Sequence, residues 1–230
     1  MIKDYSKLKN KLDYKIFVIG FNKTATTSIH NFFSKNGLSA LHAGDSPWKI
    51  EKFQCFSDNG NKRDWKKLSE TYPNSIFILN TRRMDKWIIS RSKHYSFSKW
   101  KVPRKYPPST KLFKEWILKR HNHYTEVLEF FKKSPDRLYI VDIDKEGWIE
   151  YLAKMLTLKP FKLHSNKLKD SVIPLEFMEL TRNELEKACN ELKLTEKERS
   201  SCFIQESLCK NKEYTKYQKS LLLYNDNVYF

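Results

Sequence analysis

The chain has 230 residues, of which 40% are hydrophobic and 14% aromatic, and its formal net charge is +17. This composition excludes a disordered polymer, and the low content of glycine and proline excludes a collagen-like chain. The positive charge favours an anionic partner, which could be nucleic acid, an anionic membrane surface, a polyanionic glycan or a phosphorylated cofactor. The lysines are spread along the whole chain, however, and a compositional bias of the genome explains such a distribution equally well.

The first predicted element is a short buried strand over Lys15–Gly20, apolar as in a sheet covered on both faces. A polar loop then leads into a helix over residues 26–36, which Gly37 ends. Residues 39–42 are expected to form a second strand. Residues 43–65 contain Gly, Asp, Pro, Asn and several aromatics, which predicts a loop or lid over a site.

Helices and strands alternate through the middle of the chain. We expect, in order, a helix over residues 65–72, a buried strand over 75–80, a helix over 84–94, a loop over 96–110, an amphipathic helix over 111–132, a strand over 137–141 and a helix over 148–156. This alternation predicts an α/β fold, with one three-layer domain built on a central parallel sheet.

The pattern changes beyond Pro160. Residues 170–200 are helical in pattern and highly charged, and the tail to Phe230 is polar and aromatic without a clear period. We therefore expect an α/β domain over residues 1–167 and a helical or irregular C-terminal extension over residues 168–230, packed on the same domain.

The loop Gly20–Ser28 has the chemistry of a phosphate cradle. It leaves a buried strand and opens a helix, so unpaired backbone N–H groups and the positive end of the helix converge there. Lys23 adds a cation, and the hydroxyls of Thr24, Thr26, Thr27 and Ser28 add donors. A loop with one glycine is not a Walker A sequence, which argues against a small-molecule kinase or NTPase. The simpler alternative is a helix cap rich in Ser and Thr beside a solvated lysine.

The loop resembles the 5′-phosphosulfate loop of the sulfotransferases that use 3′-phosphoadenosine 5′-phosphosulfate, whose pattern runs close to GxxKTGTTSL. The chain reads Gly-Phe-Asn-Lys-Thr-Ala-Thr-Thr-Ser-Ile from Gly20 to Ile29. Ala25 replaces the central glycine of the family, and a methyl group there hinders a left-handed turn. The resemblance implies a P-loop NTPase-like fold and a cofactor site formed by Asn22, Lys23, Thr24, Ala25, Thr26, Thr27 and Ser28.

A second match lies after the next buried strand. The family holds the 3′-phosphate of the nucleotide with an arginine and a serine spaced as R-x7-S, often with a tryptophan before the serine. Arg82 and Ser90 have this separation and Trp87 fits too, while Arg83-Met84 replaces the usual Asp-Pro. Taken alone, Arg82 could simply be a surface arginine, and Ser90 could be a helical serine that faces solvent.

A weaker similarity covers Lys159–Lys167, which resembles a segment ending in His-x-Asn that some members carry. The strand over residues 137–141 and the helix behind it also fit the family, so the resemblance spans roughly residues 15–167.

The chemistry implied is the transfer of a sulfuryl group. A preorganised cation beside the bridging oxygen lowers the barrier, and Lys23 is the candidate. A general base would deprotonate the acceptor. The candidates are His42, Asp45, Glu51 and His94. Of these, His42 and Asp45 lie at the end of the expected second strand, which should bring them close to the Lys23 loop.

Partners follow from these assignments. We expect the cosubstrate 3′-phosphoadenosine 5′-phosphosulfate, the product adenosine 3′,5′-bisphosphate, and a small-molecule or anionic-glycan acceptor, with no nucleic acid. Four cysteines without metal-ligand spacing predict no metal site. Free thiols are expected, and the alternative is a disulfide among the three cysteines that lie late in the chain. A polar N-terminus and the lack of an apolar run of ~20 residues predict a cytoplasmic protein without a membrane span. The alternative is a non-catalytic protein that binds a nucleotide, a polyanion or nucleic acid.

Overall fold

The computed structural model describes residues 15–42, 52–97, 104, 106–161, 173–202 and 228–229. The chain divides into two compact units. Unit 1 consists of Met1–Thr81, Leu128–Asn166 and Ser220–Phe230, and unit 2 of Arg82–Val127 and Lys167–Lys219. Among the described helices, none has both the length and the apolar character required to cross a membrane.

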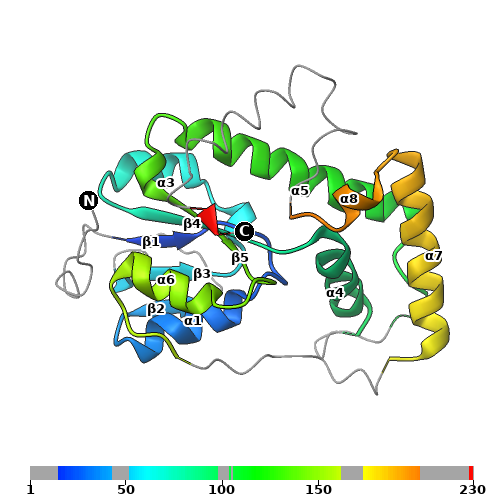
Figure 1. The fold of residues 1–230 in the computed structure, drawn as a ribbon, viewed down its shortest axis with the longest axis horizontal. Coiled ribbons are helices and arrows are strands. Elements are labelled where there is room, and N and C mark those ends of the chain that lie inside the picture. Colours follow the sequence, from blue (N-terminus) through cyan, green and yellow to red (C-terminus); the bar gives the residue numbers. More distant parts are fainter. Residues whose placement is uncertain are drawn as a thin grey trace. The chain divides into compact units, whose positions relative to one another are not determined.

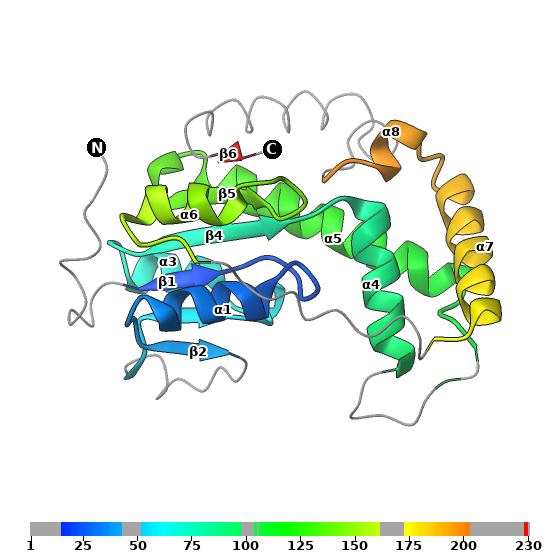
Figure 2. The same ribbon diagram turned by 60° about the horizontal axis from the view of Figure 1, so that its bottom comes forward.

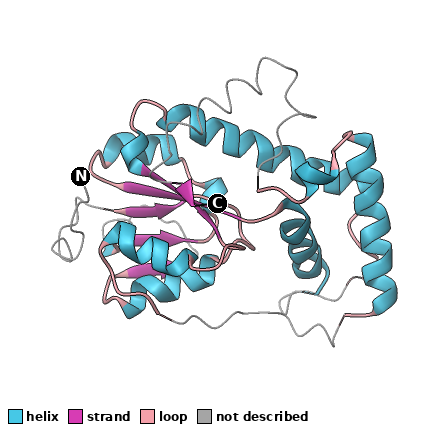
Figure 3. Ribbon diagram, viewed as in Figure 1, coloured by secondary structure: helices cyan, strands magenta, loops and turns pink. Residues whose placement is uncertain are grey.

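Unit 1 is built on a parallel sheet (Figure 3). Its strands are β1 (Ile16–Val18), β2 (Ala40–His42), β3 (Cys55–Ser57), β4 (Ile76–Thr81), β5 (Leu138–Asp142) and the two-residue β6 (Val228–Tyr229). The order across the sheet is β2-β3-β1-β4-β5-β6, with every neighbouring pair parallel. Strands β2 and β6 form the two edges (Figure 2).

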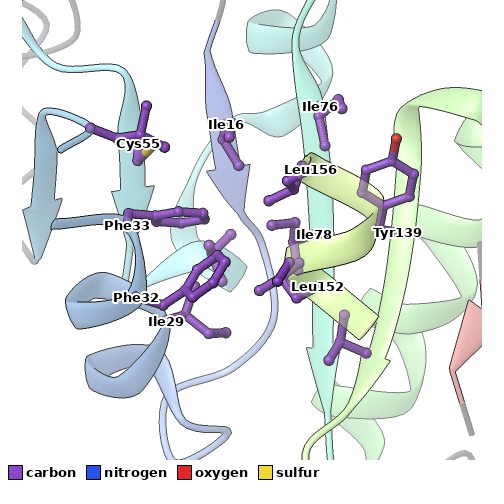
Figure 4. Packing of buried hydrophobic residues seen from close by; sticks show 14 of the residues in the cluster. Ile16, Ile29, Phe32, Phe33, Cys55, Ile76, Ile78, Tyr139, Leu152 and Leu156 are labelled. Carbon is purple, nitrogen blue, oxygen red and sulfur yellow. The ribbon is translucent and has the colours of Figure 1, made fainter. Parts of the chain in front are cut away.

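Helices cover both faces of this sheet, which makes three layers (Figure 1). The helices of unit 1 are α1 (Thr26–Lys35), the short η2 (Gly60–Lys62), α3 (Trp65–Thr71), η3 (Pro135–Arg137) and α6 (Trp148–Leu156), together with the last turn of α5 (Thr110–Phe131). Helices α1 and α6 pack on one face, and their apolar side chains meet alternate residues of β1, β3, β4 and β5 (Figure 4).

The other face of the sheet carries the stacked rings of Phe17, Phe56 and Phe77. Phe131 packs on Phe77, and Trp65 of α3 packs on Phe131. Burial on both faces explains why these strands read as unbroken apolar runs.

The strand order reverses direction between β1 and β4. The chain leaves β1 through α1 toward the β2 edge, whereas it leaves β4 toward β5 on the opposite side. In open parallel sheets, ligands bind at the carboxyl ends of the strands where the order reverses. The residues after β1 and at the end of β4 are therefore the first place to look for a site.

Unit 2 is helical and consists of α4 (Met84–Phe97), the part of α5 up to Val127, α7 (Leu175–Glu191) and α8 (Glu196–Arg199). The guanidinium group of buried Arg120 lies 4.8 Å from the centre of the Trp87 ring and 5.0 Å from that of Tyr124. It also donates to the backbone carbonyls of Arg82 and Cys202. Through these contacts, α5 is bonded to Arg82, just before α4, and to Cys202, just after α8.

The expected α/β class, the parallel sheet and helices on both of its faces are confirmed, and most predicted elements match the observed ones within a few residues. The interpretation of residues 43–65 as a loop or lid is wrong for its described part, because β3 and η2 lie there and β3 pairs with both β2 and β1. A three-residue strand is too short to show a period. Strand β6 in the tail was also not predicted. Helix α4 runs on to Phe97, beyond its expected end.

A carboxylate of α7 caps the first turn of α5. Glu184 accepts hydrogen bonds from the backbone N–H of Thr110 at 2.9 Å, from its hydroxyl at 2.6 Å and from Lys187 at 2.8 Å. The bonds from Lys187 and Thr110 lower the pKa of Glu184 to about 2.

Replacing this cap should destabilise unit 2. We expect Glu184→Ala to lower the free energy of unfolding by about 1 kcal/mol, measured by urea unfolding, while Glu179→Ala on the exposed side of the same helix changes it little. Because the pKa of Glu184 is lowered in the folded state, the stabilisation is complete above the ordinary carboxyl pKa and is lost as the pH falls toward 2. An equal effect of the two variants, or a difference independent of pH, would contradict the capping role.

Candidate phosphate-binding site

The loop Gly20–Ser28 is held by Asn80, a fully buried residue of β4. Asn80 Oδ1 accepts a hydrogen bond from the backbone N–H of Gly20 at 3.0 Å, and Asn80 Nδ2 donates to the carbonyl and hydroxyl oxygens of Thr24 at 2.7 and 2.5 Å. A Cβ atom at position 20 would lie 2.3 Å from Asn80 Oδ1 and 2.2 Å from the Asn80 carbonyl oxygen. Only glycine therefore fits between the loop and β4.

The backbone of this loop alternates in handedness. Lys23 has φ 68° and Ala25 has φ 60°, whereas Thr24 between them is not among the residues with positive φ. Such alternation turns successive N–H groups toward one side, where they form a concavity that binds anions. Ala25 is the N-cap of α1 and makes no side-chain cap, and the first turn of α1 holds no acidic residue. The N–H groups that open the helix thus add to the same positive region.

The hydroxyl groups of the loop have different uses. The Thr24 side chain is buried, and its hydroxyl donates to the carbonyl of Phe21, so Thr24 stabilises the loop from within. The Thr26 hydroxyl donates to Asp58 Oδ1 at 3.3 Å. Asn22, Lys23, Ala25, Thr27 and Ser28 are half-buried. The hydroxyl protons of Thr24 and Thr26 therefore already have acceptors within the protein, and donation to a phosphate stays a prediction for the hydroxyls of Thr27 and Ser28.

The turn after β3 lies against the same loop and was not singled out from the sequence. Asp58 and Asn59 both have positive φ, of 67° and 52°. A Cβ atom on Gly60 would lie 2.2 Å from the Val18 carbonyl oxygen, so this turn approaches the end of β1 closely. Buried Arg63 donates to that same carbonyl at 3.0 Å. The sequence signal was Asp-Asn-Gly, a strong turn signature that follows the short β3.

His42, predicted as a candidate base, lies at this site. Its Nδ1 is 3.0 Å from the Ser57 hydroxyl, and its Nε2 is 3.4 Å from the Thr27 hydroxyl. Burial lowers the pKa of His42, the charges of Arg63 and Lys23 lower it further, and Asp58 opposes them. The ring is therefore neutral at pH 7 and can accept a proton.

Arg82 and Ser90 belong to unit 2. Arg82 is the first residue after β4, its carbonyl accepts from Arg120, and its side chain is half-buried. Ser90 is half-buried on α4, as is His94. Trp87 packs in the interior, where the guanidinium groups of Arg91 and Arg120 lie over its ring.

Asp45, Glu51 and residues 162–167 lie outside the described residues. Within the described ranges, no group of three or more His, Cys, Asp or Glu side chains could hold a metal ion. No protein-family model matches the chain, and no curated protein matches it.

The Asn80 bridge can be tested by one amide-to-acid change. Asn80→Asp keeps the acceptor for Gly20 but removes both bonds to Thr24 and buries a carboxylate against a carbonyl oxygen. We expect a loss of about 3 kcal/mol in the free energy of unfolding, measured by urea unfolding at pH 7. Asn74→Asp, an exposed change of the same kind, should cost almost nothing. Similar losses in the two variants would contradict a specific role for Asn80.

The left-handed backbone at Ala25 gives a second test. Ala25→Gly removes the clash of Cβ in this conformation, which costs about 1–2 kcal/mol, against a smaller entropic gain of the unfolded glycine. We expect the variant to be more stable by about 0.5–1 kcal/mol. Ala153→Gly inside α6 should instead be less stable by at least about 1 kcal/mol. A destabilised Ala25→Gly variant would show that residue 25 does not adopt positive φ.

Proposed function

We propose that the chain is a sulfotransferase, which moves a sulfuryl group from 3′-phosphoadenosine 5′-phosphosulfate to a hydroxyl or amine acceptor. The observation that carries this proposal is the backbone of the 20–28 loop, which Asn80 holds in alternating handedness at the switch point of a parallel sheet. The sequence of that loop resembles the family's 5′-phosphosulfate loop, and its geometry suits a phosphate. On this proposal, the left-handed conformation of Ala25 explains why the family's pattern has glycine there.

In the proposed reaction, a bond forms between the acceptor atom and sulfur while the bond from sulfur to the bridging oxygen of the 5′-phosphate breaks. The electron pair of the broken bond stays on that oxygen, where negative charge develops. Lys23 and the N–H groups at the start of α1 would stabilise this charge, and they need no reorganisation because the loop is already shaped.

The proton of the acceptor would go to His42. The neutral ring can take it, Ser57 and Thr27 orient the ring, and Asp58 would stabilise the imidazolium that forms. Asp45 remains a candidate for the same role. Asp58, through its bond with Thr26, would act as a positioning residue.

The 3′-phosphate would be bound by Arg82 and Ser90. A planar guanidinium suits two oxygens of one phosphate. Arg82 follows β4 directly in the chain, two residues after Asn80. The acceptor is a small alcohol or amine, or an anionic glycan. The alternative function remains a protein that binds a nucleotide or polyanion without transfer.

Calorimetric titration with adenosine 3′,5′-bisphosphate, 5′-AMP and ATP tests the cofactor. We expect wild type to prefer the bisphosphate. Arg82→Ala should weaken that binding about 10- to 100-fold, the equivalent of one charge-assisted contact, and leave 5′-AMP unaffected. Lys23→Ala should weaken both nucleotides, because both carry the 5′-phosphate.

Two neighbouring cations serve as controls. Arg83→Ala and Lys35→Ala remove one charge each, next to Arg82 and at the end of α1 respectively, and should change binding less than about twofold at moderate salt. Equal, weak and salt-sensitive binding of all three nucleotides would contradict the proposal and favour a polyanion binder.

A further inference from the structure

Two histidines of unit 1 lie beside each other, next to the 20–28 loop. His30 is on α1 and His42 ends β2, and their ring centres are 5.4 Å apart with 42° between the ring planes. The proposed reaction uses His42 but gives His30 no role.

His30 carries a buried polar atom that its surroundings do not explain. Its Nδ1 is buried and has no hydrogen-bond partner among the described residues. A buried polar atom of this kind is costly, and a bound ion is one of the ordinary explanations.

The separation of the rings fits one shared metal ion. In tetrahedral sites Zn²⁺ lies about 2.0–2.1 Å from each imidazole nitrogen, which places the centres of two such rings roughly 5 Å apart. His42 Nδ1 is occupied by Ser57 at 3.0 Å, whereas its Nε2 has only the long contact of 3.4 Å with Thr27. Thr27 precedes His30 by three residues on α1, so its hydroxyl lies on the same side of the helix.

We propose that His30 Nδ1 and His42 Nε2 bind a borderline divalent cation such as Zn²⁺, with the Thr27 hydroxyl and water completing its coordination. Burial lowers the pKa of both rings, which favours the neutral form that metals require. Asp58 attracts a cation at this position, and Lys23 and Arg63 oppose it, so the affinity is modest. Should the proposed transfer reaction hold, the metal occupies the lone pair of His42 that would take the acceptor's proton, and Zn²⁺ inhibits the enzyme.

Calorimetric titration of the metal-free full chain with Zn²⁺ tests the site directly. Wild type should bind one ion with micromolar affinity. Since even outer-shell partners of a metal contribute about 10- to 100-fold to affinity, the loss of a ligand in His30→Ala or His42→Ala should weaken binding at least about tenfold. His123→Ala, which removes a histidine of α5, should leave the affinity within about twofold of wild type.

His30→Gln repeats the test with a side chain closer in size to histidine, in case the alanine variant does not fold. With Cu²⁺ as the probe, electron paramagnetic resonance should show coupling to two nitrogens in wild type and to one in His30→Gln. Absence of binding in wild type, or equal affinity in all variants, overturns the proposal. The titration contains no nucleotide or acceptor, so its outcome is independent of the proposed sulfotransferase activity.

Discussion

The hydrogen bonds of one buried amide, Asn80, determine the shape of the 20–28 loop. Asn80 binds the loop at Gly20, where it leaves β1, and at Thr24, just before α1 begins. Lys23 and Ala25 are left-handed, and each such non-glycine residue costs about 1–2 kcal/mol. The bonds of Asn80, at about 0.5–1.5 kcal/mol each, are of comparable size. An unfavourable backbone therefore persists because a side chain of the neighbouring strand holds it, and its N–H groups converge on one side as a result.

The sheet topology extends this constraint to the rest of the candidate site. Strand β3 pairs with both β2 and β1, which brings the ends of three strands to the same edge of unit 1. His42 at the end of β2, Ser57 and Asp58 at the end of β3, and Lys23 after β1 thereby come within electrostatic or hydrogen-bonding range of one another. Because Gly60 has no side chain, the turn after β3 can approach the end of β1 closely. Thr26 and Thr27 in the first turn of α1 then connect the loop to Asp58 and His42.

Much of this arrangement could be predicted from the sequence, because β1, β4 and β5 are strongly apolar runs and the residues after β1 carry an unusual density of hydroxyl groups. Strand β3 could not, since three residues show no period and its pairing depends on contacts far along the chain. The sequence pattern predicts only that Asn80 ends a strand. Its role follows only from the proximity of β1 and β4, which is a tertiary property. For the same reason Thr24, a hydroxyl donor by composition, turns out to have its hydroxyl bonded inside the loop. The sequence thus indicates which chemical groups lie in the loop, but only the structure shows the hydrogen-bond partner of each side chain.

We propose above all that the backbone N–H groups of this loop bind the 5′-phosphate of a nucleotide. The most direct measurement is the change in amide chemical shifts of ¹⁵N-labelled protein on titration with adenosine 3′,5′-bisphosphate. We expect the largest changes on the amides of residues 23–27, and we expect 5′-AMP to change the same amides at higher concentration. Changes spread over lysine-rich surface segments, with the amides of residues 23–27 unaffected, would contradict this proposal.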